Sequence, residues 1–152
     1  YNLGIALVAE GKNEEAISHY KMAIKIKPDY ADAHYNLGIA LVAEGKNEEA
    51  ISHYKMAIKL KPDYADAHNN LGIALFAKQK IEEAISHYKM AIGLKPDFAE
   101  AYNNLGAALF NAEMTEEAID YFKEAIRIRP GFAAAQENLE TALRSMEIQD
   151  LF

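Results

Sequence analysis

The same residues return every 34 positions along this chain of 152 residues, and this spacing constrains the fold more than any other feature of the sequence. A fixed period of this length is typical of stacked supersecondary units, none of which can bury its own apolar face alone. The sequence therefore predicts a repeat array, a class of protein that mostly presents surfaces to partners. The recurring residues are a glycine (Gly4, Gly38, Gly72, Gly106), a leucine (Leu3, Leu37, Leu71, Leu105), a proline (Pro28, Pro62, Pro96, Pro130), an alanine (Ala16, Ala50, Ala84, Ala118) and an aromatic residue (Tyr20, Tyr54, Tyr88, Phe122).

Each repeat is predicted to contain two helices joined by a short turn. In residues 31–64 the apolar residues follow three- and four-residue spacing on both sides of Gly45, which indicates a helix on each side. We expect Gly45 to end the first helix in a left-handed conformation and Asn47 to cap the second helix. Pro62 closes the repeat, because the residue before a proline disfavours the helical conformation.

Small residues at fixed positions predict close packing of the helices. Gly38 and Ala50 should let the two antiparallel helices of a repeat approach each other, with Tyr54 filling the space between them. A large residue at a small position would overpack this contact, at a cost of roughly 1–3 kcal/mol. A methionine ladder is expected to pack between repeats: Met22, Met56 and Met90.

This pattern of small and large residues, with a proline closing every unit, resembles the tetratricopeptide repeat (TPR) over the whole chain. The resemblance implies an all-α fold, a right-handed α-solenoid of helix-turn-helix hairpins with a C-terminal capping helix. At the first-helix position where the family has a large aromatic residue, this chain departs from the pattern and has His34, His68 and Tyr102. Pentatricopeptide arrays, which bind RNA through a basic lining, and the longer Sel1-like repeats fit less well.

The 34-residue register divides the chain into one array. The expected divisions are a partial repeat (1–30), three full repeats (31–64, 65–98 and 99–132), a capping helix (133–147) in which Leu139 and Leu143 continue the core, and a tail (148–152). Residues 1–30 and 35–64 differ only at Ile26 and Leu60, which suggests a recent internal duplication or deliberate design. Because the chain begins inside a repeat without an initiator methionine, we expect a fragment with an open N-terminal end that favours head-to-tail self-association.

The composition argues against several classes of function. A net charge of −7 argues against nucleic acid and against an anionic membrane surface, because both require clustered Lys and Arg. The chain contains no cysteine, so disulfides and thiolate metal sites are excluded. No apolar run approaches the roughly 18–20 residues of a membrane span, and no signal peptide is visible. These absences say little about a longer parent protein, so the location is unknown and a cytoplasmic one is only our default expectation.

Five asparagines also recur at intervals of 34, each directly before a leucine. In TPR arrays the first helix of each repeat lines the concave surface, so the resemblance implies that these amides form a file along a groove. The file is similar to the asparagine ladder with which O-linked N-acetylglucosamine transferases hold substrate peptides; the alternative is that the asparagines make internal contacts. The predicted groove residues are Asn2, Asn36, Asn70, Asn104 and Asn138, flanked by Tyr35, Asn69, Asn103, Ile39, Ile73, Phe76, Phe110, Asp32, Asp66 and Glu100, with Val42 and Ala107 beside them.

The mixed apolar, amide and acidic lining suits a neutral or basic extended segment of a protein partner. TPR domains that clamp the C-terminal carboxylates of chaperones use Lys and Arg at groove positions. Those positions here hold Asp66, Asn70, Tyr35 and Ile39, so a carboxylate clamp is not expected. The alternative is that the carboxylates are solvated and serve only solubility.

No constellation of residues supports catalysis or a cofactor. His19, His53 and His87 recur at intervals of 34, but successive copies would lie two helix layers apart, too far to share a metal ion. His34 and His68 are expected to fill packing positions. We therefore predict a non-catalytic interaction scaffold; the alternatives are a substrate-recruiting arm of a larger enzyme such as an O-linked glycosyltransferase, and a self-assembling structural solenoid.

Overall fold

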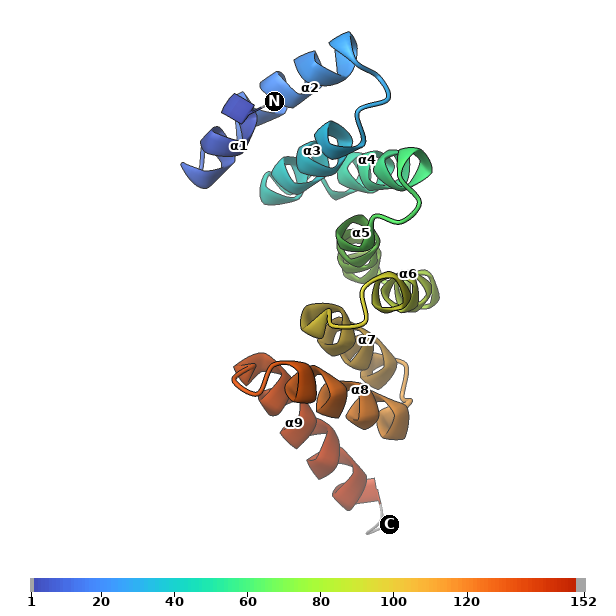
Figure 1. Ribbon diagram of the computed structural model, residues 1–152. Helices are drawn as coiled ribbons and strands as arrows, with labels where there is room; N and C mark the ends of the chain where they lie inside the picture. Colours follow the sequence, from blue (N-terminus) through green and yellow to red (C-terminus); the bar gives the residue numbers. More distant parts are fainter. Residues whose placement is uncertain (1, 150–152) are drawn as a thin grey trace. The chain divides into compact units, whose positions relative to one another are not determined.

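The computed structural model describes residues 2–149, and within this range every regular element is an α-helix (Figure 1). The predicted all-α solenoid of helix-turn-helix hairpins is confirmed. The helices are α1 (Asn2–Ala9), α2 (Asn13–Ile26), α3 (Ala31–Ala43), α4 (Asn47–Leu60), α5 (Ala65–Ala77), α6 (Ile81–Leu94), α7 (Ala99–Asn111), α8 (Thr115–Ile128) and α9 (Ala133–Gln149).

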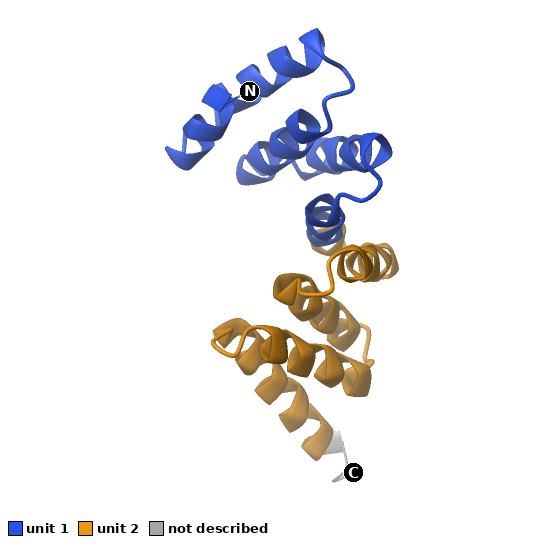
Figure 2. Cartoon of the chain, in the orientation of Figure 1, with its two compact units in different colours: residues 1–74 blue, residues 75–152 orange. Residues whose placement is uncertain are grey.

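The chain divides into two compact units, residues 1–74 and 75–152, and the division falls within α5 (Figure 2). In the first unit α1 packs on α2, α2 on α3 and α3 on α4. In the second unit α6 packs on α7, α7 on α8 and α8 on α9, and α9 also contacts α7. Within each unit the helices therefore pack mainly on their neighbours along the sequence, as expected of repeat proteins.

The core of each unit is built from the recurring residues of the sequence. Leucines of the first helices and aromatic residues of the second helices are the largest fully buried side chains. They are Tyr20, Leu37, Leu41 and Leu71 in the first unit, and Leu75, Leu105, Leu109 and Phe122 in the second. These side chains form the apolar faces of their helices, and a helix can bury such a face only by packing against another helix.

Within each unit, hairpins close on a contact between a glycine and an aromatic ring. Gly38 of α3 faces Tyr54 of α4, and a Cβ added to Gly38 would lie 2.5 Å from Cε1 of the ring. Gly106 of α7 faces Phe122 of α8, where the corresponding distance is 2.6 Å. Both rings are buried, so neither can move aside to admit a side chain. The close approach predicted from the glycine ladder is confirmed.

The turn inside a hairpin is closed by backbone hydrogen bonds. Gly45 has a φ of +72°, as predicted, and the N–H of Lys46 donates to the carbonyl oxygen of Leu41 at 2.8 Å. This bond is that of a Schellman motif, which satisfies carbonyl groups left over at the end of a helix. Gln79 and Glu113 take the same left-handed conformation, with φ of 60° and 62°, although neither is a glycine.

The structure corrects the predicted cap of the second helix. The N-cap of α4 is Lys46, which makes no side-chain cap hydrogen bond, and Asn47 is the first residue of the helix. Lys46 both ends the turn and starts the helix, because its N–H closes the turn and its carbonyl oxygen accepts the first helical hydrogen bond, from the N–H of Ala50 at 3.0 Å. Glu48 and Glu49 lie in the first turn, where carboxylates interact favourably with the helix dipole.

Two expected contributions to the core are wrong. The methionines Met22, Met56 and Met90 are 57%, 38% and 49% exposed, so they lie at the surface and are not enclosed between repeats. In α9, Leu143 is 42% exposed, whereas its neighbour Ala142 is fully buried. Adjacent residues of a helix point about 100° apart, so the buried face of α9 lies to one side of the predicted face.

The end of α9 also differs from the expected division. The helix extends to Gln149, two residues beyond the predicted end at 147, so residues 148 and 149 are helical instead of part of a tail. The remaining residues of that predicted tail, 150–152, lie outside the described residues.

The glycine contact predicts opposite effects for two alanine substitutions in the second unit. Gly106→Ala should destabilise the chain by roughly 1–3 kcal/mol, because its Cβ would overlap the buried Phe122 ring. Gly93→Ala, in α6, meets no atom within 4 Å and should stabilise by about 0.5–1 kcal/mol through helix propensity. Urea denaturation followed by circular dichroism measures both; equal effects would contradict the close contact.

The left-handed turn residues predict a second pair of opposite effects. Glu113→Gly should stabilise the chain by about 1 kcal/mol, because glycine adopts a φ of 62° without the steric cost that a Cβ brings. Gly45→Ala should destabilise by a similar amount through the backbone alone, since no atom lies within 4 Å of the added Cβ. Thermal and urea unfolding would show these shifts, and a neutral Glu113→Gly would count against the strained turn.

Candidate functional site

A cavity of about 170 Å³ lies in the first unit, lined by side chains of α3, α4 and α5. Ile39 and Val42 come from α3, Tyr54 from α4, and Asn70 and Ile73 from α5. Val42 and Ile73 are 39% and 43% exposed, so this lining is open to solvent. An engineered apolar cavity of about 150 Å³ holds benzene, so this cavity has room for one medium-sized apolar group.

The repeat geometry explains why these residues meet. On α5, Asp66, Asn70 and Ile73 are spaced by four and three residues, so they share one face of the helix. Positions 32, 36 and 39 of α3 have the same spacing. Tyr54 reaches this face from α4 because Gly38 leaves room for its ring between the two helices.

Amide and hydroxyl groups form the polar edge of the cavity. The Nδ2 of Asn70 donates to the Tyr35 hydroxyl at 3.1 Å, and the Nδ2 of Asn69 donates to Oδ1 of Asn70 at 3.3 Å. On α3 the Nδ2 of Asn36 donates to the backbone carbonyl of Asp32 at 2.8 Å. The amide of Asn70 is therefore held in one orientation at the border of the apolar lining.

The tyrosines beside the cavity are neutral at ordinary pH. Burial raises the pKa of the Tyr35 hydroxyl to about 12, and the Asp66 carboxylate adds to this effect against the hydrogen bond from Asn70. Burial raises the pKa of Tyr54 as well, and Tyr35 contributes in the same direction. Both hydroxyl groups therefore keep their protons and can serve as hydrogen-bond donors and acceptors.

The carboxylates on this face differ between the two units. Asp32 and Asp66 are half-buried, and neither forms an ion pair within the part of the chain that the structure describes. Glu100, the corresponding residue of α7, pairs with Arg129. Burial acts to raise the pKa of Glu100, but the hydrogen bond and charge of Arg129, a backbone hydrogen bond and the charge of Lys95 together outweigh it and hold the pKa below its usual value.

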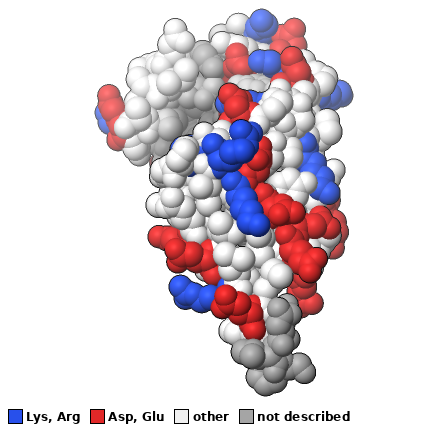
Figure 3. All heavy atoms as spheres, turned by 60° about the horizontal axis from the view of Figure 1, so that its bottom comes forward, with Lys and Arg blue, Asp and Glu red and all other residues white. Residues whose placement is uncertain are grey.

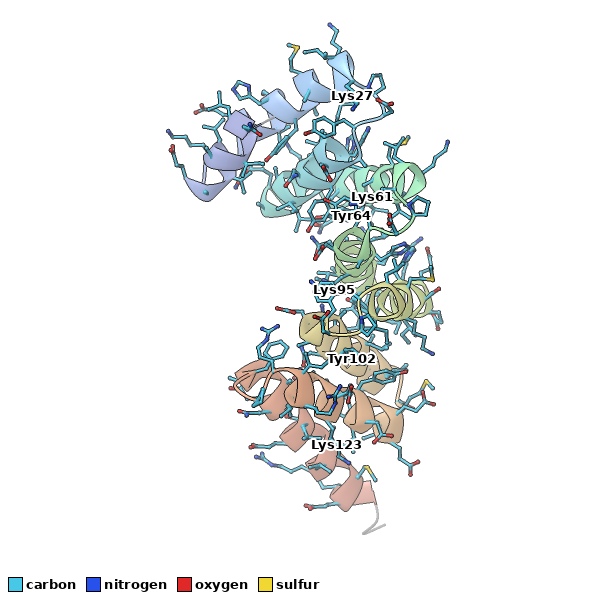
Figure 4. All side chains as sticks on the ribbon, in the orientation of Figure 1. Lys27, Lys61, Tyr64, Lys95, Tyr102 and Lys123 are labelled. Carbon is cyan, nitrogen blue, oxygen red and sulfur yellow. The ribbon has the colours of Figure 1, made fainter. Side chains whose placement is uncertain are left out.

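The cations of the loops are engaged with aromatic rings. The Nζ of Lys61 lies 4.5 Å from the centre of the Tyr64 ring in the loop before α5, and both residues are labelled in Figure 4. Arg129 lies at the same distance from the Phe132 ring. Figure 3 shows acidic and basic side chains interspersed over the face that it draws.

In the second unit the predicted groove residues form a different arrangement. The Nδ2 of Asn138 donates to Oδ1 of Asn103 at 2.9 Å, which links α9 to α7. Asn104, Phe76 and Phe110 are half-buried. In the first unit, by contrast, Asn2 of α1 is exposed and lies outside the lining of the cavity.

Two predicted groove residues are buried and one lining residue was missed. Asn69 and Asn103 are only 5% and 9% exposed, so their side chains face the interior more than the sequence indicated. Tyr54 lines the cavity although it was assigned to the core. The sequence feature that indicates this position is the glycine ladder opposite Tyr54, because a ring that passes beside a glycine can reach the far face of the helix.

Histidines form a pair inside the first unit. The Nε2 of His34 lies 3.1 Å from the carbonyl oxygen of Pro28, so this nitrogen carries the proton and donates it. The Nδ1 of His34 then accepts from the Nδ1 of His53, 3.0 Å away. His34 and His68 are buried, as predicted, and the Nε2 of His68 donates to Pro62 at 3.2 Å.

Neither a metal centre nor a membrane helix is found in residues 2–149. No group of three or more His, Asp or Glu residues in this range could hold a metal ion. None of the helices that the structure describes combines the length and the apolar character needed to cross a membrane.

Sequence profiles of the TPR repeat match residues 4–43, 40–79 and 74–112, and a tetratricopeptide repeat profile matches residues 99–132. The chain belongs to the tetratricopeptide repeat family. TPR proteins are generally non-catalytic scaffolds that bind peptides or proteins. No curated protein matches the chain by sequence.

Solved TPR structures resemble the chain closely. The crystal structure of MamA matches with a TM-score of 0.89 and 28% identity, covering 97% of this chain and 86% of MamA. YrrB, described as a TPR protein with an unusual peptide-binding site, has a TM-score of 0.82 and 25% identity over 96% of this chain and 75% of its own. The first TPR of Spaghetti (RPAP3), bound to the HSP90 peptide SRMEEVD, has a TM-score of 0.76 and 25% identity over 77% of this chain and 93% of its own.

The buried histidines of this TPR array predict a loss of stability in mild acid. Burial lowers the pKa of His53; His34 and Lys21 lower it further, and Glu49 acts in the opposite direction. Burial also lowers the pKa of His68, although the hydrogen bond to Pro62 acts to raise it. Below about pH 6.5 these histidines bind protons more readily in the unfolded chain than in the folded chain. The free energy of unfolding is therefore highest above this pH and decreases as the pH falls below it.

His68→Gln tests this pH dependence. Gln136 of α9 stands at the corresponding position and donates to the Pro130 carbonyl at 2.8 Å, so glutamine can keep the bond to Pro62 without titrating. The variant should match the parent chain at pH 7.5 and lose less stability at pH 5.5, in urea denaturation. His19→Gln, on the exposed part of α2, is the matched control; equal losses in parent and His68→Gln chains would contradict the prediction.

Proposed function

We propose that this TPR array is an interaction scaffold that holds an extended segment of a partner protein against α3 and α5 of the first unit. The observation that carries the proposal is the open apolar cavity of about 170 Å³ with an oriented amide at its edge. A side chain of the partner segment would enter the cavity, and the backbone of that segment would lie along Asn70.

Asn70 is suited to bind a peptide backbone. An amide has two N–H donors and an oxygen with two lone pairs, and the bonds to Tyr35 and from Asn69 use one of each. The Asn70 side chain is also hydrogen-bonded to the Tyr54 hydroxyl, which engages the second donor, so one lone pair of Oδ1 remains for a backbone N–H of the partner. These internal bonds also reduce the entropy that ordering the Asn70 side chain would cost on binding.

The solved relatives support a peptide as the kind of ligand. The first TPR of RPAP3 holds an HSP90 peptide, and YrrB is described as having a peptide-binding site. A cavity and an amide on one helical face are the features that such a ligand needs, namely a place for a side chain and a partner for the backbone.

A displayed library of random nonapeptides tests the proposal. We expect selected peptides to bind the Asn70→Ala and Ile73→Ser variants at least fivefold more weakly than the parent chain, because the first loses about one hydrogen bond and the second loses apolar contact. Titration calorimetry measures the affinities, and circular dichroism verifies that each variant is folded.

The controls are matched in residue type and exposure. Asn111→Ala removes an exposed amide at the end of α7, and Leu94→Ser removes a side chain that is 39% exposed, close to the 43% of Ile73. Both should leave the affinity unchanged. The proposal would be overturned if no peptide were selected, or if the controls weakened binding as much as the cavity variants.

A further inference from the structure

We infer that the segment bound in this cavity combines a leucine-sized apolar side chain with a Lys or Arg about two residues away. This inference rests on the proposed function and adds the chemistry of the ligand. It is drawn from the order of groups on the two helices that line the cavity.

The groups on α5 change from acidic to amide to apolar along one face. Asp66, Asn70 and Ile73 follow one another at four- and three-residue spacing, and Asp32, Asn36 and Ile39 repeat this order on α3. Seven residues of helix span about 10 Å, which separates the carboxylates from the apolar cavity. In an extended peptide, residues two apart point to the same side about 7 Å apart, and the flexible arm of Lys or Arg covers the remaining distance.

The carboxylates of the first unit are available for a cation. Asp32 and Asp66 are half-buried, and no ion pair involves either of them among residues 2–149. Asp66 is the charge that acts on Tyr35, whose hydroxyl binds Asn70 at the edge of the cavity. The negative charge therefore lies beside the place where the backbone of the ligand would bind.

The second unit shows how the carboxylate that corresponds to Asp32 is neutralised. Arg129 both lies over the Phe132 ring and pairs with Glu100, so the carboxylate there is already neutralised. Two repeats earlier, the residue that corresponds to Arg129 is Lys61. Lys61 lies over the Tyr64 ring and makes no ion pair with Asp32. A guanidinium has several donors in a planar fork and can do both, whereas an ammonium is a single point charge. Glu100 is also one methylene longer than Asp32, which extends its reach towards the cation.

The apolar part of the inference follows from the lining of the cavity. Ile39, Val42 and Ile73 are aliphatic, and the ring of Tyr54 completes the lining. The volume of about 170 Å³ is close to that of a cavity known to hold benzene, so one leucine-sized group fits and two do not. An acidic ligand such as the SRMEEVD peptide held by RPAP3 would bring carboxylates next to Asp66, where like charges repel.

A matched set of synthetic peptides tests the inference. The probe is the nonapeptide Ser-Gly-Lys-Gly-Leu-Gly-Lys-Gly-Ser, compared with one in which Leu is replaced by Gly, one in which both Lys are replaced by Glu, and SRMEEVD. Binding is followed by NMR through the methyl signals of Ile39, Val42 and Ile73. We expect either replacement to weaken binding by about tenfold or more, and SRMEEVD to bind no better than the Glu peptide.

Salt and a charge variant separate the two parts of the inference. Higher salt should lower the affinity of the Lys peptide until it approaches that of the Glu peptide, because salt screens the charges. The loss of affinity caused by the Leu replacement should stay the same. Asp66→Asn should weaken the Lys peptide but not the Glu peptide. Asp29→Asn, an exposed carboxylate in the loop before α3, is the control and should change neither.

The outcomes distinguish this inference from the function on which it rests. Equal or tighter binding of the Glu peptide, or of the peptide without Leu, would overturn the inference. If the random library yields peptides that depend on Asn70 and Ile73 but carry no such pair of residues, the scaffold function stands and the inference fails. If neither the library nor the designed peptides bind, both fail.

Discussion

The contact between a glycine and an aromatic ring sets how closely the two helices of a hairpin approach. At Gly38 and Gly106 the ring occupies the place where a Cβ would stand, so the helix backbones can approach until the ring touches the main chain. The fully buried leucines of the first helices supply much of the remaining core. Because each repeat has little core of its own, a loss of this contact would weaken the neighbouring hairpin as well.

The same contact also creates the candidate site. Tyr54 is held beside Gly38 and is only 2% exposed, yet part of its ring lines the open cavity between Ile39 and Ile73. A side chain at position 38 would push the ring away and change the shape of the cavity. The packing that stabilises the hairpin and the surface that would receive a ligand therefore cannot be altered independently.

Features that the period specifies directly could be predicted from the sequence, and features that depend on helix rotation could not. The hairpins, the left-handed Gly45 and the contact of Gly38 with Tyr54 follow from which residues recur. Periodicity does not state which face of a helix points inward, because every position recurs equally. For this reason Asn69 and Asn103 were expected on the surface but are buried, and Leu143 was expected in the core but is exposed.

The chemistry of the site depends on departures from the repeat. The two units share a fold, but Arg129 pairs with Glu100 in one of them, while the lysine at the corresponding place in the other leaves Asp32 without an ion pair. Two exchanges, Lys for Arg and Asp for Glu, therefore separate a carboxylate that is neutralised within the chain from one that is left for a ligand. In an array whose packing residues are almost constant, such exchanges on the exposed helix faces are the changes that can alter ligand preference without altering the fold. Selectivity along the array should therefore be sought at these positions before it is sought in the conserved spacing of the amides.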